Sequence, residues 1–130
     1  MGGVSLWTLT GSEAPVATAL MTHPQESTVW TEPSEELVGR LEVSDEGCVV
    51  IRRSEGDVLL LAEAGSRLID GGRKVEVAHV GTFVLGEVID HGGDIDTYWR
   101  GGKRFTAPEW NQCVGPDVRT VETAVLARPR

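Results

Sequence analysis

Residues 37–62 read LVGRLEVSDEGCVVIRRSEGDVLLLA, and this stretch decides the fold class. Apolar and charged residues alternate over residues 37–43. Residues 45–47 then supply a turn, because glycine tolerates the positive φ that a chain reversal often needs. A second strand is predicted at residues 48–53, and after another turn the apolar run at 58–62 suits a central strand covered on both faces. Short strands joined by tight turns predict β structure.

The same pattern continues through the rest of the chain. Alternation and β-branched residues predict strands at residues 74–78, 82–90, 95–99 and 118–126. Residues 91–94 break the pattern, and the only candidate helix, residues 14–21, is too short to stand alone. We therefore expect an all-β domain over residues 37–130, a small, partly open barrel of the OB type or a sandwich, with about six strands.

Length and charge narrow the class of protein. A chain of 130 residues is one domain by size. Twenty acidic against twelve basic residues give a net charge of −8, and no Lys or Arg precedes Arg40. General nucleic-acid binding is disfavoured, because phosphate contacts need a basic surface. No apolar run reaches the length of a membrane span, and the first residues lack the positive charge of a secretory signal. Residues 1–36 are predicted to form an acidic, polar, irregular arm.

Glycines and cysteines of the body form a second pattern. It comprises GRL at 39–41, GCVVI at 47–51, the apolar strand at 58–61, Gly86, Gly92-Gly93, and Cys113 ahead of the last strand. In these features residues 37–93 and Cys113 resemble small β-rich envelope or secreted proteins of actinobacteria, many of them uncharacterised. The resemblance implies export and a bond between the two cysteines, and it implies no activity.

Cys48 and Cys113 stand 65 positions apart, one early in the predicted barrel and one before its last strand. Their even number and placement predict a disulfide, which in the loop-entropy model adds roughly 4 kcal/mol of stability. Two buried free thiols are the alternative. A disulfide would indicate an extracytoplasmic location, and free thiols the cytoplasm or a virion. Neither cysteine has the Cys-x-x-Cys spacing of a redox or zinc site.

Four of the seven aromatic residues fall within residues 98–110, together with three cations. Because aromatic and arginine side chains concentrate binding energy at interfaces, this segment is the predicted contact surface of a non-enzymatic binding or accessory module. The candidate binding residues are Tyr98, Trp99, Arg100, Lys103, Arg104, Phe105 and Trp110. The expected ligand is a protein partner or a second copy, with carbohydrate as another possibility; net charge disfavours single-stranded nucleic acid. The alternative is a small accessory core covering one end of the barrel.

Two further tryptophans, Trp7 and Trp30, lie in the acidic arm among proline and threonine residues. A tryptophan in a solvated arm loses little by docking into a neighbour. This predicts an alternative function, a structural subunit of a larger assembly such as a phage particle, docked through residues 1–36. Packing of both tryptophans on their own barrel is equally open.

His91, Asp94 and Asp96 are the candidate metal ligands. The two carboxylates project to one side of an extended chain, and the histidine could fold over them. Oxygen-rich ligands suit Ca²⁺ or Mn²⁺, so a metal-dependent enzyme is a third hypothesis. The alternative is a hairpin turn in which Asp and Gly serve backbone geometry. The sequence has no nucleophile elbow and no nucleotide-binding glycine loop, so we predict no catalytic residue and no cofactor.

Overall fold

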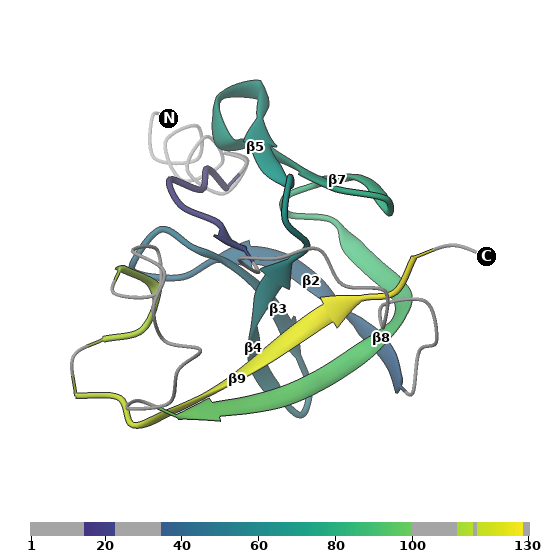
Figure 1. Cartoon of the computed structure of the whole chain (residues 1–130). Helices are drawn as coiled ribbons and strands as arrows, with labels where there is room; N and C mark the ends of the chain where they lie inside the picture. Colours follow the sequence, from purple (N-terminus) through teal and green to yellow (C-terminus); the bar gives the residue numbers. More distant parts are fainter. Residues whose placement is uncertain (1–14, 23–34, 100–111, 116, 129–130) are drawn as a thin grey trace, which may run out of the picture.

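The computed structural model describes residues 15–22, 35–99, 112–115 and 117–128, and these residues are almost entirely strands and turns (Figure 1). The elements in chain order are β1 (Met21–Thr22), β2 (Glu35–Val43), β3 (Val49–Arg53), β4 (Gly56–Ala62), β5 (Arg67–Ile69), the 3₁₀ turn η2 (Asp70–Gly72), β6 (Lys74–Val77), β7 (Gly81–Val84), β8 (Val88–Trp99) and β9 (Thr120–Leu126).

Five strands close into a barrel. Their order is β4-β3-β2-β8-β9, and β9 returns to pair with β4. Neighbouring barrel strands are antiparallel except β4 and β9, which are parallel. Counted along the chain, the barrel strands lie side by side in the order first, second, third, fifth and fourth, which is a Greek-key arrangement like that of OB-type barrels. The predicted all-β barrel is confirmed, and the parallel pair closes it.

Alternation along the strands decides which side chains fill the barrel. In β2, Leu37 and Leu41 have no exposed surface, whereas Val38 is 46% exposed on the outer face. In β4 the run Val58–Ala62 is buried on both faces, as its unbroken apolar sequence predicted. The apolar cluster inside the barrel also takes in three residues from the segment between β4 and β8, namely Val75, Val77 and Leu85.

A small antiparallel sheet, β5-β6-β7, connects β4 to β8. Figure 1 shows it beside one end of the barrel. Among the residues that the structure describes, none belongs to a helix with the length and apolar character needed to cross a membrane.

Three segments differ from their predicted structure. Residues 82–90 were expected to form one strand, but β7 ends at Val84 and β8 begins at Val88, with a turn between them. Residues 91–94 were expected to break a strand, but β8 runs through them because Gly93 pairs with β2 on one side and β9 on the other. Residues 15–22, expected within the arm and considered as a short helix, are extended and pack on the barrel, with three buried side chains: Ala17, Leu20 and Met21. Trp7 and Trp30 lie outside the described residues.

Candidate functional site

The turn between β2 and β3 forms one half of the candidate site. Ser44 organises this turn through its backbone and its side chain. Its N–H donates to the Cys48 carbonyl at 2.8 Å, and its carbonyl accepts the Gly47 N–H at 2.9 Å. Its hydroxyl accepts the Cys48 N–H at 3.2 Å. These bonds fix Cys48 directly before β3.

A disulfide joins this turn to the connection between β8 and β9. Cys48 and Cys113 are bonded, with their Cα atoms 5.7 Å apart, and both are buried. The disulfide predicted from the sequence is therefore confirmed. Gln112 adds two bonds, since its side-chain amide donates to the Glu46 carbonyl at 3.1 Å and to the Thr18 hydroxyl at 3.4 Å. Residues 112–113 are thus held firmly on the turn.

The disulfide belongs to a second apolar cluster, which lies on the outer face of β3 and β4. Val50, Leu59 and Leu61 point outward from these strands and are nevertheless at most 8% exposed. They are covered by β1 and by the residues next to the disulfide, and the complete cluster consists of Met21, Cys48, Val50, Leu59, Leu61, Cys113 and Val114. The barrel therefore has apolar packing on both sides of its β3–β4 wall.

The aromatic–basic segment begins at the end of β8 and continues into the connection that this disulfide anchors. β8 and β9 remain paired up to Trp99 and Thr120, so the connection leaves the barrel at Trp99. Its other end is held at residues 112–113. The side chains of Tyr98 and Trp99, and residues Arg100, Lys103, Arg104, Phe105 and Trp110, lie outside the described part of the chain. The structure shows where residues 98–110 are anchored: on β8 at their start, and at residues 112–113 just beyond their end.

The predicted metal ligands are placed on β8, and the strand separates them. His91 is on the face that turns into the barrel, where its ring meets Phe83 edge-on at a centroid distance of 5.8 Å. Asp94 and Asp96 are an odd number of positions away, so they belong to the opposite face. Because β8 is continuous here, His91 does not fold over the two carboxylates, and these residues do not form the hairpin turn that was the alternative. Within the described ranges, no three His, Cys, Asp or Glu residues gather as a metal site.

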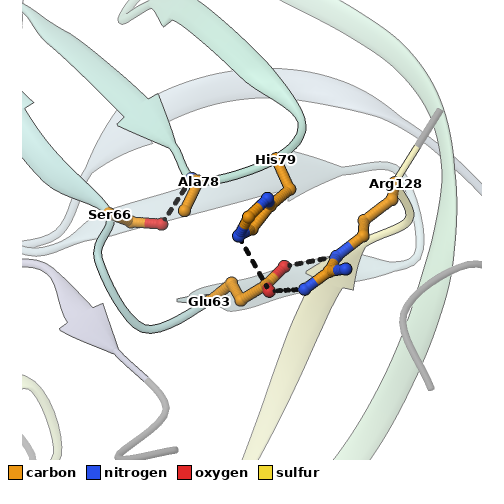
Figure 2. A network of polar contacts seen from close by, with 5 residues as sticks. All are labelled: Glu63, Ser66, Ala78, His79 and Arg128. Atoms are coloured by element: carbon orange, nitrogen blue, oxygen red, sulfur yellow. Dashed lines mark hydrogen bonds and ion pairs between the residues drawn. The ribbon is translucent and has the colours of Figure 1, made fainter. Parts of the chain in front are cut away.

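A buried carboxylate that the sequence did not single out links three parts of the fold (Figure 2). Glu63 directly follows β4 and is 1% exposed. Arg128, beyond β9, donates from Nε to Oε2 of Glu63 at 3.1 Å and from Nη2 to Oε1. His79, in the turn between β6 and β7, places Nε2 3.8 Å from the same Oε1. Its φ of 63° is one of two positive values among non-glycine residues of the described chain.

This cluster, Glu63 with Arg128 and His79, is a buried ion-pair network that connects three segments of the fold. The bidentate guanidinium of Arg128 compensates the charge of the Glu63 carboxylate, so this buried group is held in an ion pair. The sequence signal for this cluster was the position of Glu63 directly after an apolar strand. A carboxylate that follows a fully buried run must either be exposed by a turn or be paired with a cation. Its partners come from segments 16 and 65 positions away, which sequence patterns do not connect.

No family model matches the chain, and neither a curated protein nor a solved structure matches it. Function therefore has to be argued from the arrangement of the site.

Proposed function

We propose that the chain is a non-enzymatic binding or accessory module, with residues 98–110 as its contact surface. OB-type barrels bind ligands through the face of their second and third strands and through two loops, those between strands one and two and between strands four and five. In this chain those loops are the Ser44–Cys48 turn and the β8–β9 connection. The observation that carries the proposal is that the aromatic–basic segment begins at the end of β8 and continues into the second loop, and that a disulfide joins the two loops.

Anchoring favours binding because a contact loop with fixed ends loses less conformational entropy when it meets its ligand. Loops held on a rigid strand scaffold are common binding elements for the same reason. The hydrogen bonds of Gln112 and the buried disulfide supply that scaffold here. The contact residues of this proposal are Tyr98, Trp99, Arg100, Lys103, Arg104, Phe105 and Trp110.

A protein partner, including a second copy, is the proposed ligand, with carbohydrate as the other candidate. Tryptophan, tyrosine and arginine are the residues that dominate protein interfaces. Nucleic acid is disfavoured by the net charge of −8 and by the apolar cover on the outer face of β3 and β4, where OB-type barrels stack bases. The disulfide supports an oxidising, extracytoplasmic compartment as the place of action.

The test compares two double variants that each remove two tryptophans. Trp99→Ala/Trp110→Ala alters the proposed contact surface, and Trp7→Ala/Trp30→Ala is the matched control in the arm. We expect the first to lower affinity at least about 30-fold, because truncating an interface anchor costs about 2 kcal/mol or more. Binding is measured by titration calorimetry against the partner captured by the wild-type chain, and on a glycan array.

Thermal unfolding of both variants verifies that the barrel is intact. Equal binding by the wild type and Trp99→Ala/Trp110→Ala would contradict the proposal. Loss of binding in the Trp7→Ala/Trp30→Ala control alone would transfer the contact surface to residues 1–36.

A further inference from the structure

Residues 15–22 are held on the barrel as an added peptide strand. The Ala17 N–H donates to the Gly72 carbonyl at 2.8 Å, and the Thr18 N–H donates to the Gly47 carbonyl at 2.8 Å. β1 then pairs in parallel with the end of β4. This is strand addition to a sheet edge, in which backbone hydrogen bonds supply much of the affinity.

Three glycines make room for the segment. A Cβ at Gly72 would collide with the Ala17 carbonyl, one at Gly47 would collide with the Thr18 hydroxyl, and one at Gly86 would lie 3.1 Å from Cδ of Pro15. These glycines come from three separate turns of the fold. We call the surface made by Gly47, Gly72, Gly86 and the end of β4 the docking surface.

Side chains of the segment complete the contact. Ala17, Leu20 and Met21 are 4%, 8% and 0% exposed, so the segment buries its apolar residues on the docking surface. Val16, between Pro15 and Ala17, is 46% exposed and faces away from the core. The segment therefore buries side chains in both apolar clusters, Ala17 and Leu20 in the first and Met21 in the second, while Val16 stays exposed.

We infer that the docking surface is an interface between copies of this chain, and that its occupant there is the 15–22 segment of a second copy. All backbone bonds described above join the segment to residues beyond position 46, so the same segment of another copy would make identical contacts. This inference is independent of binding by residues 98–110. It bears on the assembly-subunit function that the acidic arm suggested.

The chain length permits the exchange. Twelve residues, 23–34, separate Thr22 from the start of β2. Such a connection can span up to roughly 40 Å. That reach exceeds the radius of gyration of a 100-residue domain, about 13 Å, so it is sufficient to carry the segment to an adjoining copy.

Concentration determines which copy supplies the segment. A segment tethered by a short linker competes for its own docking surface at an effective concentration of about 1 mM. Exchange therefore prevails above this concentration, as in a crowded assembly. At about 1 mM the two arrangements are equally populated, and dilution returns the segment to its own chain. Both arrangements have the same contacts at the docking surface.

The test uses the full chain in ¹⁵N-labelled and unlabelled forms. Both forms carry Val16→benzoylphenylalanine, because residue 16 is exposed and the Val16 Cγ1 would lie 3.1 Å from a Cβ at Gly72. The forms are mixed in equal amounts at about 1 mM, incubated and irradiated. Mass spectrometry then separates same-isotope from mixed-isotope crosslinks between residue 16 and residues 70–73.

At about 1 mM roughly half of the segments should dock on another copy, so about a quarter of the crosslinks should join unlike isotopes, and this fraction should fall at least tenfold on dilution to about 10 μM. Same-isotope crosslinks alone at every concentration would overturn the inference, since the segment then never leaves its chain. Failure to crosslink to residues 70–73 would overturn it as well, because the docking surface would not hold residue 16.

Two neighbouring glycines provide matched variants. Gly72→Ala introduces the collision with Ala17, whereas a Cβ at Gly71 has no atom within 4 Å. Both glycines have positive φ, 89° and 65°, so alanine strains the backbone at either position, and the collision with Ala17 is specific to residue 72. We expect Gly72→Ala to lose both kinds of crosslink and Gly71→Ala to keep them. Equal crosslinking in the two variants would contradict the docking surface as defined.

Discussion

At the scale of single residues, burial rather than the nitrogen–oxygen distance decides which ion pairs contribute to stability. Of the charged side chains that the structure describes, Glu63 is the one that is buried. The Arg67–Glu76 pair has a good nitrogen–oxygen distance of 2.8 Å, but its side chains are 70% and 42% exposed. Water therefore screens the surface pair, whereas Glu63 depends on Arg128 for compensation of its charge.

Arg128→Met is expected to lower the free energy of unfolding by about 3 kcal/mol, because it leaves a buried carboxylate without its bidentate partner. Glu63→Leu/Arg128→Met should cost less than Arg128→Met alone, since the double variant has no unpaired buried charge. Urea unfolding measures all three chains. The control is Arg67→Met, which breaks the exposed pair and should cost less than about 1 kcal/mol. Similar losses for the two arginine variants would show that Glu63 does not need the pair.

At the scale of elements, β8 is the long strand that pairs with both β2 and β9. It pairs with β2 over residues 88–93 and with β9 over residues 93–99, and Gly93 is the position where both pairings meet. A Cβ at Gly93 would collide with the Val125 carbonyl and would lie 2.6 Å from Cδ1 of Leu37. The two strands can approach this closely only because residue 93 has no side chain.

Gly93→Ala is expected to lower the free energy of unfolding by about 2 kcal/mol, the cost typical of an overpacked core. The strand backbone is otherwise suitable for alanine, because the φ of Gly93 is not among the positive values of the described glycines. Gly115→Ala is the matched control, since its Cβ would have only an ordinary contact at 3.7 Å. Urea unfolding of the two variants separates a steric cost at residue 93 from a general cost of replacing glycine, which would affect both equally.

The elements also show how far the sequence could predict this fold. Alternating and apolar runs such as Leu37–Val43 and Val58–Ala62 were assigned correctly, because each pattern depends on burial within its own strand. Residues 91–94 were wrongly expected to break the strand, since their glycines and aspartates favour turns locally. Pairing with strands over 30 positions away overrides that preference. Docking of residues 15–22 and the partners of Glu63 were missed for the same reason, because both depend on distant segments.

At the scale of the whole molecule, the Cys48–Cys113 disulfide limits the number of conformations open to the unfolded chain. The disulfide spans 65 positions, half the length of the sequence, and it connects the first turn of the barrel to the connection before its last strand. It therefore restricts every barrel strand except the first and the last. A loop of this length gives the bond a large effect in the chain-entropy model.

Reduction should lower the free energy of unfolding by about 4 kcal/mol. Cys48→Ala/Cys113→Ala should be destabilised to a similar extent and should no longer respond to reductant. Urea unfolding with and without dithiothreitol makes the measurement on both chains. A change below about 1 kcal/mol on reduction would contradict the chain-entropy account of this bond.

Closure through β4 and β9 also has a consequence for biosynthesis. β9 is the last strand of the barrel in the chain, and it covers an edge of β4, which is completed some sixty residues earlier, and an edge of β8. The edge of β4 lacks this neighbour while the ribosome adds residues 63–119, and the edge of β8 lacks it after residues 88–99 have been made. Unpaired edges of this kind recruit other strands, so the nascent chain is exposed to aggregation until residues 120–126 have emerged. The barrel is therefore completed only when β9, its last strand in the chain, has been made.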